Sequence, residues 1–496
     1  MKYIKIILIM LSVSFVGLFI YKFSDENTNQ TISKKTKDML SFTIDGVKST
    51  SMPTKGSGYV AKSITCKNNS ILSWDNDNWS IEIEKLSGEE LCNIDFTKGT
   101  ATYIVKINSD TTSSFDSTSK TTTKNGTVRF YSNYDTTISG CSYTKKDNKI
   151  TINNVSGNVV CNVSVKNTIY NKLLIDNPTI KIRTEFESGY TETNTKTLFK
   201  AKENGTTVYY FSGDAQNNWV KFGKNASNQD LYWRIIRTNK DGSVKLLYHE
   251  TSTTSQTSYL TDNVAFNIVS SDPMYGGYMY GISGSPENNR LNINSSNVKS
   301  IVDEWYLNNL KEYSKYLSTA AVYCNDRGEP KGLYNTGSTD FEYAPWYRFT
   351  ENKTPTYDCN NVKDAFSGEN DEALLTCTTE PGSICPIALM TADEAIYAGG
   401  KYLKALTSPY AWYYTNSDGE SSTGELYWWL MTPTNWYQGQ IDSLRVRGTN
   451  LPAAIDDYRV HVSANTAVRP VISIKGDLLW NTGDGSATNP YEVVLN

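Results

Sequence analysis

Cysteine and histidine are the residue types in this 496-residue sequence that could supply a nucleophile, a metal ligand or a redox pair. None of the eight cysteines belongs to a CxxC pair, and neither histidine, His249 or His461, lies near a cysteine in the sequence. Zinc ligands are normally closely spaced cysteines and histidines, so a zinc site is poorly supported. We therefore assign no metal and no cofactor, and a Cys–His or Ser–His catalytic pair has few possible partners.

Disulfide bonds explain the cysteines better. Their even number and their position after an apolar N-terminal segment are typical of a chain translocated into an oxidising compartment. Side chains alternate along a strand, so Cys92 shares a face with Ile94 and Phe96 and should point into a core. The expected pairs are Cys66 with Cys92, Cys141 with Cys161, Cys324 with Cys359, and Cys377 with Cys385.

The sequence around two of these cysteines is repeated. IEIEKLSGEELCNIDF at 81–96 aligns without a gap with ITINNVSGNVVCNVSV at 150–165, and the Ser-Gly and Cys-Asn dipeptides match. Alternating residues on both sides of a glycine turn predict a hairpin in each copy. The repeat therefore predicts two small all-β, sandwich-like modules, at 39–98 and 99–168, which act as cross-linked spacers.

The N-terminus carries a targeting signal. Lys2 and Lys5 precede an apolar run of about 16 residues from Ile6 to Tyr21, close to the roughly 20 that span a bilayer. No A-x-A-like cleavage site follows, which favours an uncleaved signal anchor at 1–22 over a removed signal peptide. Positive charge before the span predicts a single-pass protein of the cell membrane, with a polar stalk at 23–38 and the bulk of the chain extracellular.

Charge and length narrow the class of protein further. The formal net charge of −4 provides no basic footprint, which argues against nucleic acid as a partner. The 34 tyrosines and 32 glycines, with abundant Asn, Ser and Thr, favour short strands joined by turns. A chain of this length is expected to form about two to four domains.

The chain after a connector at 169–204 has the pattern of an α+β domain, at 205–496. Residues 230–250 predict two strands joined by an Asn-Lys-Asp-Gly turn. Three later segments in which apolar and polar residues largely alternate predict further strands. They are SLRVR at 443–447, YRVHV at 458–462 and VRPVISI at 468–474.

Two helices are expected in this domain. Apolar residues at helical spacing predict one at 296–310, with Ser296 as its N-cap. Residues 391–400 predict a shorter helix that Thr391 caps and Gly399-Gly400 end. The fold class is therefore mixed, with a transmembrane helix, two β modules and an α+β domain.

WWLMTP at 428–433, followed by AVRPVISI at 467–474, resembles the WWLRSP…GVRPA pattern of an uncharacterised family of bacterial cell-surface proteins. DLYWRIIRTNKDGSVKLLY, SSNVKSIVDEWYLNNL and ALMTADEAIYAGG also look like segments of that family, so the resemblance covers roughly 205–496. More distantly, the pattern is similar to C-type-lectin-like folds, including formylglycine-generating enzyme and the variable receptor proteins of diversity-generating retroelements. The resemblance implies a C-type-lectin-like C-terminal domain.

Two departures from the pattern limit what the resemblance implies. Met431-Thr432 replaces the usual Arg-Ser, which puts a polar role at these positions in doubt. The sequence contains no EPN, QPD or WND triplet, so calcium-dependent sugar binding is not supported.

The resemblance implies that loops between the C-terminal strands form a recognition surface. The aromatic residues of these loops offer large contact area at low entropic cost. At least one of Trp428 and Trp429 is expected in the core, whereas Trp436 and Tyr437 follow a Pro-Thr-Asn turn signal and are expected on a loop, in ligand contact or local packing. The candidate ligand-binding residues are Trp412, Tyr413, Tyr414, Trp436, Tyr437, Arg445, Arg447, Tyr458 and His461.

The sequence thus predicts a surface-anchored binding or adhesion protein whose ligand is a glycan or a protein. One alternative is an extracellular enzyme related to formylglycine-generating oxidases, but no cysteine follows Cys385 to form the required pair in the C-terminal core. Another is a carboxylate-based hydrolase, although no spacing of Asp and Glu indicates one. The third is a purely structural envelope protein, which should bury the loop rings or use them between subunits.

Overall fold

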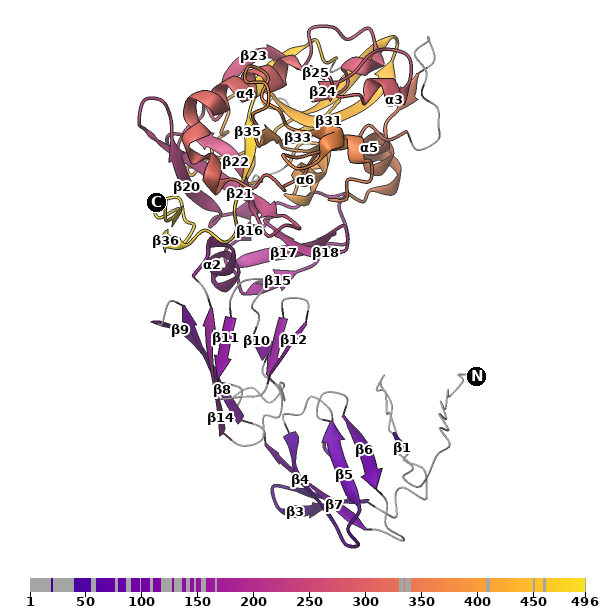
Figure 1. Ribbon diagram of the computed structural model, residues 1–496, viewed down its shortest axis with the longest axis vertical. Coiled ribbons are helices and arrows are strands. Elements are labelled where there is room, and N and C mark those ends of the chain that lie inside the picture. The colour runs from indigo at the N-terminus through magenta and orange to yellow at the C-terminus, as the bar shows by residue number, and fades with distance from the viewer. Residues whose placement is uncertain are drawn as a thin grey trace. The chain divides into compact units, whose positions relative to one another are not determined.

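The chain is mostly β-sheet and divides into two compact units, Met1–Lys166 and Asn167–Asn496 (Figure 1). Each unit has its own sheets. The computed structural model describes residues 19–20, 40–54, 59–75, 79–85, 91–98, 100–107, 110–116, 127–128, 136–139, 143–146, 149–152, 158–165, 167–329, 334, 340–406, 411–448, 451–457 and 461–495.

The first module consists of two sheets that pack against each other, with the strand orders β3-β2-β7-β4 and β1-β6-β5. Phe42 and Phe96 of the first sheet share one buried cluster with Ile81 of the second. The ring of Trp74, on β5, lies 5.3 Å from that of Phe96. The strands are β1 (Phe19–Ile20), β2 (Leu40–Ile44), β3 (Val47–Ser49), β4 (Tyr59–Cys66), β5 (Ile71–Asp75), β6 (Ser80–Lys85) and β7 (Cys92–Lys98).

The second module has the same strand order in its four-stranded sheet, β9-β8-β14-β11, and a three-stranded sheet β10-β13-β12. One strand enters at a different point of the chain: β1 precedes β2, whereas β10 lies between β9 and β11. In each module an early strand pairs in parallel with the last one, β2 with β7 and β8 with β14. The strands are β8 (Thr100–Ile107), β9 (Asp110–Asp116), β10 (Thr127–Val128), β11 (Thr136–Ser139), β12 (Tyr143–Lys146), β13 (Lys149–Ile152) and β14 (Asn158–Val165).

The repeated segments do not form hairpins, so that prediction is wrong. Ile81 of β6 pairs with Trp74 of β5, whereas Cys92 of β7 pairs with Cys66 of β4. The chain therefore crosses from one sheet to the other between β6 and β7, and likewise between β13 and β14. Alternation identifies a half-buried strand but not its partner, because strands of both sheets have the same period.

Three of the expected disulfides are present: Cys66–Cys92, Cys324–Cys359 and Cys377–Cys385. Cys66 and Cys92 lie directly opposite each other in β4 and β7, so their bond joins neighbouring strands of one sheet. Cys141 lies outside the described residues, and its bond to Cys161 stays a prediction.

The expected membrane anchor at 1–22 and stalk at 23–38 lie outside the described residues, except for Phe19–Ile20, which form β1 beside β6. Within the described part of the chain, no helix combines the length and apolar character needed to cross a membrane. The anchor stays a prediction.

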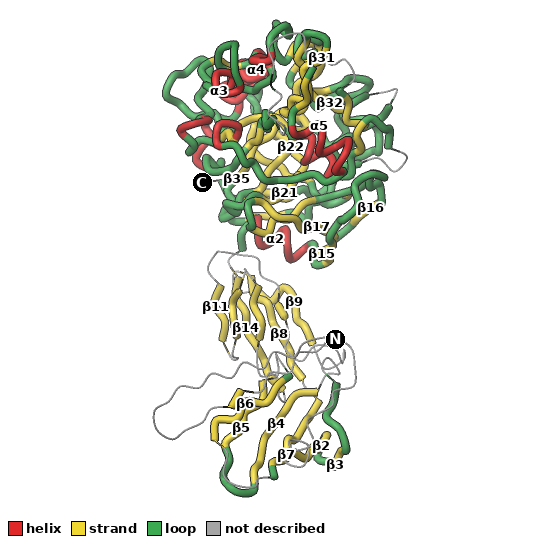
Figure 2. Tube along the Cα trace, turned by 90° about the vertical axis from the view of Figure 1, so that its right-hand side faces the viewer, coloured by secondary structure: helices red, strands yellow, loops and turns green. Residues whose placement is uncertain are grey.

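A ten-stranded sheet forms the centre of the unit Asn167–Asn496. β21 and β22 are the hairpin expected at 230–250, and β35 lies beside β22 (Figure 2). The sheet continues from β35 to β29. The other strands follow the order β15-β17-β18-β21-β20-β37-β36. The bounds are β15 (Thr179–Lys181), β17 (Thr197–Glu203), β18 (Thr206–Tyr210), β20 (Trp219–Lys224), β21 (Asp230–Thr238), β22 (Val244–Glu250), β29 (Ile387–Leu389), β35 (Pro470–Ile474), β36 (Trp480–Thr482) and β37 (Tyr491–Val493).

A seven-stranded sheet, in the order β23-β34-β31-β32-β33-β30 with β27 beside β31, contains the predicted site residues Trp436, Tyr437 and Arg445. Its strands are β23 (Thr261–Ala265), β27 (Phe341–Glu342), β30 (Lys401–Tyr402), β31 (Trp428–Tyr437), β32 (Gln440–Val446), β33 (Ala454–Asp456) and β34 (Asn465–Val468). Shorter pairs join β16 (Thr193–Asn194) to β19 (Asp214–Ala215), β24 (Met279–Tyr280) to β25 (Asn294–Ser295), and β26 (Tyr323–Cys324) to β28 (Ala365–Phe366).

Both expected helices are present. Ser296 caps α4 (Asn297–Asn309) by accepting the Lys299 N–H at 3.0 Å, and α4 packs against β23 and β29. Thr391 and Glu394 form a reciprocal capping box at the start of α6 (Ala392–Tyr397), which satisfies two otherwise unpaired N–H groups. Further helical segments of this unit are α2 (Ile169–Asp176), α3 (Pro286–Asn289), α5 (Ala344–Tyr347) and the π-helical turn η3 (Arg348–Asn352).

The segment 169–204, expected as a connector, is part of the second unit. It contains α2, whose Leu173 is fully buried, and β17, which lies between β15 and β18 in the ten-stranded sheet. The sequence signal is weak for α2 because its partners are distant in the chain: the Ile169 N–H donates to the Leu478 carbonyl at 2.8 Å.

β31 continues through Pro433, where the sequence predicted a turn. The pairing with β32 is irregular on both sides of Pro433, and such irregularity accommodates a residue that has no N–H for the ladder. The turn follows at Gln438–Gly439, both at positive φ, as in the two-residue turns that suit hairpins.

Candidate functional site

The aromatic run at 412–414 lies in the interior of the second unit. The Trp412 ring N–H donates to the Phe211 carbonyl at 3.2 Å, and the Tyr413 hydroxyl donates to the Ala453 carbonyl at 2.7 Å. Trp412 and Tyr413 are 0% exposed and Tyr414 is 6% exposed. These rings connect distant backbone segments to each other, and they do not form the expected exposed patch.

The aromatic residues of β31 divide between core and surface. Trp428 and Trp429 are both buried, which confirms the expected core role for that pair. Trp436 is buried in the strand as well, whereas Tyr437 is 43% exposed. Tyr458 lies outside the described residues.

Arg445 and Arg447 meet Asp456 across β32 and β33. Arg445 Nη2 lies 3.2 Å from Asp456 Oδ2, and Arg447 Nη1 lies 3.7 Å from Asp456 Oδ1. The Arg445 guanidinium also stacks 4.4 Å from the centre of the Tyr427 ring. Both arginines are thus occupied within the protein, which leaves them little capacity to bind a ligand.

His461 lies beside the buried carboxylate of Asp442, and Asp457 is a second buried carboxylate nearby. His461 Nδ1 lies 2.7 Å from Asp442 Oδ1. Burial raises the pKa of Asp442 to about 6, although His461 opposes the shift. Burial also raises the pKa of Asp457 to about 6, although Asp457 accepts a hydrogen bond from Tyr402. Both carboxylates are nearly inaccessible, which does not suit attack on a large substrate.

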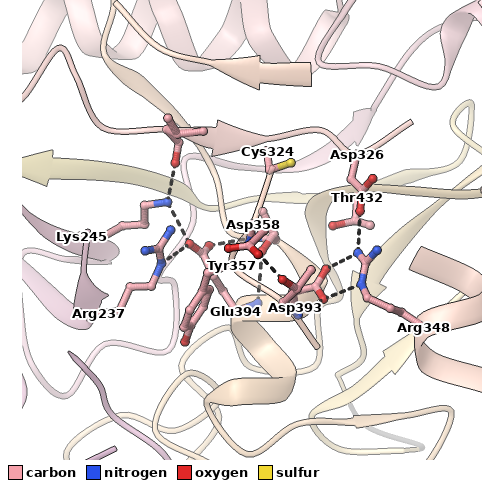
Figure 3. A pocket seen from close by; sticks show the side chains of 13 residues that line it. Arg237, Lys245, Cys324, Asp326, Arg348, Tyr357, Asp358, Asp393, Glu394 and Thr432 are labelled. Atoms are coloured by element: carbon pink, nitrogen blue, oxygen red, sulfur yellow. Dashed lines mark hydrogen bonds and ion pairs between the residues drawn. The ribbon is translucent and has the colours of Figure 1, made fainter. Parts of the chain in front are cut away.

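A cavity in the second unit is lined by charged side chains from β21, β22 and α6 (Figure 3). Arg237 Nε and Lys245 Nζ converge on Glu394 Oε1, at 2.9 and 2.8 Å, and Arg237 also pairs with Glu203 at 2.7 Å. Burial favours the neutral acid, but Lys245 and Arg237 hold the pKa of Glu394 at about 2. The carboxylate is therefore ionised and neutralised internally.

Arg348 completes the lining of this cavity. Its guanidinium donates to both carboxylate oxygens of Asp393, at 2.9 and 2.7 Å, and to Asp326 at 2.6 Å (Figure 3). The cavity volume is only about 20 Å³. A single water needs about 10–15 Å³, so the cavity has room for one water and not for an organic ligand. We interpret this charged cluster as a structural network that holds α6 against β21 and β22.

A second, larger pocket opens where α6, η3 and β30 meet. Its volume is about 140 Å³, close to the roughly 150 Å³ of an engineered cavity in another protein that accommodates benzene. Aromatic and aliphatic side chains and three lysines form its walls. We call it the lysine pocket; its lining is Phe186, Glu187, Phe349, Lys353, Pro355, Ile396, Lys401, Tyr402 and Lys404.

Regular elements position the walls of the lysine pocket. Phe349 belongs to η3, Ile396 to α6 and Tyr402 to β30, and the Phe349 and Tyr402 ring centres lie 6.1 Å apart. Arg183 fixes the Phe186 wall: its guanidinium lies 4.5 Å from the centre of that ring and donates to the Ile396 carbonyl at 3.0 Å. The pocket is thus built on packed elements.

Sequence reasoning missed the lysine pocket. Its residues come from segments around 186, 349, 396 and 402, and no short motif contains more than a few of them. The segment 391–400, which the sequence predicts as a helix, supplies one wall of the pocket. Lys401 and Lys404 follow its Gly399-Gly400 stop, and no local pattern marks them as pocket residues.

Comparisons with known proteins found no match for this chain: no family model, no curated protein and no solved structure matches it.

Proposed function

We propose that this protein is a surface-anchored extracellular binding protein whose C-terminal unit holds its ligand in the lysine pocket. The observation that carries the proposal is the ring-sized volume of this pocket, enclosed by Phe186, Phe349 and Tyr402. Small-molecule sites are concave and combine apolar walls with polar groups that orient the ligand. The pocket is concave and combines aromatic and aliphatic side chains with four charged ones.

The organisation of the chain supports this proposal. Disulfides such as Cys66–Cys92 are typical of oxidising, extracellular compartments. In the proposed arrangement, the N-terminal segment 1–22 anchors the chain in the membrane and the two β modules are spacers. The unit that follows is a divergent C-type-lectin-like α+β domain, which the order of the WWL and VRP motifs supports.

Binding arrays can test the proposal. The full-length chain, purified in detergent, is screened against glycan and protein arrays beside Lys404→Trp, which places a bulky ring at the pocket. Lys240, an exposed lysine in the β21–β22 turn, provides the matched control Lys240→Trp. We expect ligands that bind the wild type and the control but not Lys404→Trp. Ligands that bind all three proteins equally would reject the pocket as the site.

A structural envelope protein is the second candidate function. The burial of Trp412, Tyr413 and Trp436 favours it, because a spacer is expected to use such rings internally. This candidate predicts that no array ligand depends on Lys404. It also predicts that the purified chain self-associates.

A further inference from the structure

We infer that the lysine pocket binds a carboxylate-bearing sugar ring, as found in acidic glycans. This inference rests on the proposed binding function and names its ligand class.

The described lining of the pocket carries more positive than negative charge. Lys353, Lys401 and Lys404 line it together with a single carboxylate, Glu187, so the lining has a formal charge of 3 − 1 = +2. This charge is opposite in sign to the net charge of −4 of the whole chain. Such local reversal inside a concave site concentrates anions there.

Within the described part of the chain, none of the three pocket lysines has an ion pair or a side-chain hydrogen bond. Some other lysines do have carboxylate partners, such as Lys245 with Glu394 and Lys311 with Glu380. Lys353 follows η3 with a left-handed backbone, φ 52°, and is exposed. Unpaired ammonium groups at a pocket can form charge-assisted hydrogen bonds with a ligand without first breaking internal ones.

The volume and the walls favour a ring as the bearer of the anion. A pocket of about 140 Å³ holds one six-membered ring, and the Phe349 and Tyr402 rings are tilted by 39° on one wall. A pyranose has an apolar C–H face that packs on such rings and polar edges that hydrogen-bond. An inorganic anion would leave the apolar walls unused, and a neutral ring would leave the lysines without partners.

Arg183 supports the Phe186 wall from behind. Its guanidinium covers the Phe186 ring and its Nη1 donates to the Ile396 and Tyr397 carbonyls, at 3.0 and 2.9 Å. Its charge interacts with that of Glu185, so Arg183 leaves the net positive charge of the lining unchanged.

The test measures whether binding depends on the carboxylate. The full-length chain is titrated by biolayer interferometry against an oligogalacturonide, a hyaluronan oligosaccharide and sialyllactose, each beside its carboxyl-reduced, neutral counterpart. We expect at least one acidic sugar to bind, and its neutral counterpart to bind at least about tenfold more weakly. Added salt should weaken the binding of the acidic sugar and leave that of the neutral counterpart unchanged. Two charge-assisted hydrogen bonds account for a loss of this size.

Substitutions then locate the site. The double variant Lys401→Gln/Lys404→Gln should weaken acidic-sugar binding about tenfold or more, whereas Lys240→Gln/Lys315→Gln, at two exposed lysines outside the pocket, should not. Thermal unfolding of both variants checks that each is folded. Equal binding of neutral counterparts, unchanged binding by the pocket double variant, or no binding of any acidic sugar would overturn the inference.

These outcomes separate the inference from the proposed function. If Lys404→Trp abolishes binding of a neutral or protein ligand from the arrays while acidic sugars do not bind, the pocket is the site and the acidic-sugar assignment is wrong. If Lys404→Trp affects no ligand, the proposed function fails as well.

Discussion

The Tyr402 hydroxyl donates a hydrogen bond to Asp457 Oδ2 at 2.6 Å, which connects a wall of the lysine pocket to a buried carboxylate next to β33. Tyr402 itself is held in β30, which pairs in parallel with β33. The orientation of one pocket ring therefore depends on a group that gains or loses a proton near pH 6.

Replacement of Asp457 by Asn should stabilise the protein at alkaline pH. Burial raises the pKa of Asp457 from 3.8 to about 6, so the folded state binds this proton more tightly than the unfolded state. The free energy of unfolding should therefore fall as pH rises from about 4 through 6. Asp457→Asn removes the cost of the buried charge, which is up to about 3 kcal/mol at pH 8.

Denaturant unfolding of the second unit at pH 5 and pH 8 measures this effect. The exposed Asp477→Asn is the matched control, and we expect it to leave the pH dependence unchanged. An equal change in stability at both pH values in Asp457→Asn would show instead that ionisation of Asp457 costs the folded state no stability.

His249 should make the protein acid-sensitive. Burial lowers the pKa of His249 well below 6.5, and the positive charges of Arg469 and Arg234 add to this shift. The unfolded state then binds more protons than the folded state below pH 6.5, so stability is present above that pH and is lost as pH falls. The expected slope is at most about 1.4 kcal/mol per pH unit.

The variant His249→Gln removes the contribution of His249 protonation to the pH dependence of stability. Its unfolding free energy should change less between pH 7 and pH 5 than that of the wild type, whatever its absolute stability. Hydrogen–deuterium exchange of β22, the strand that contains His249, can follow the same difference locally. Parallel pH profiles for the two proteins would contradict the assignment.

Glu394→Gln should strongly destabilise the second unit. The substitution keeps a side chain that can complete the capping box, but it leaves Arg237 and Lys245 without half of their shared negative charge. Breaking a buried ion pair on one side costs about 3–5 kcal/mol. Thr391→Ala, which removes the cap alone, should cost about 1 kcal/mol.

At acidic pH, the free energies of unfolding of Glu394→Gln and the wild type should become more similar. The pKa of Glu394 is lowered to about 2, so its contribution is complete above its ordinary value of 4.5 and is lost as pH falls toward 2. Calorimetric unfolding at pH 7 and pH 3 provides the comparison. A difference that stays constant over this range would indicate a packing effect.

Removal of the Cys66–Cys92 bond should destabilise the first module alone. The bond closes a separation of 26 residues, which corresponds to about 3.5 kcal/mol of loop-closure entropy in the unfolded chain. Cys66→Ser/Cys92→Ser should lower the melting temperature of the first unit and leave that of the second unchanged. Non-reducing peptide mapping of the same sample tests the predicted Cys141–Cys161 bond, and free thiols there would reject it.

The sequence predicted the features that are encoded locally. Ser296 and the Thr391–Glu394 pair satisfy backbone groups within one helical turn, so α4 and α6 could be placed from their caps. The disulfide Cys66–Cys92 followed from strand parity, because parity places a side chain on a definite face.

Features that depend on distant partners could not be predicted in the same way. Trp412 is buried because the Phe211 carbonyl, about two hundred residues earlier in the chain, accepts its N–H, and nothing near Trp412 in the sequence indicates this. Pro433 reads as a turn residue, yet irregular pairing with β32 keeps it inside β31. The lysine pocket likewise exists only because η3, α6 and β30 converge.

The parallel pairing of β2 with β7 has a mechanical consequence for a chain tethered to a surface. Leu40 lies opposite Cys92 and Ile44 opposite Phe96, so the chain enters the ladder at one end and leaves it at the other. Tension between these points pulls the two strands lengthwise past each other and loads all of their hydrogen bonds together. β8 and β14 have the same geometry, so each module resists stretching by shear instead of by sequential peeling.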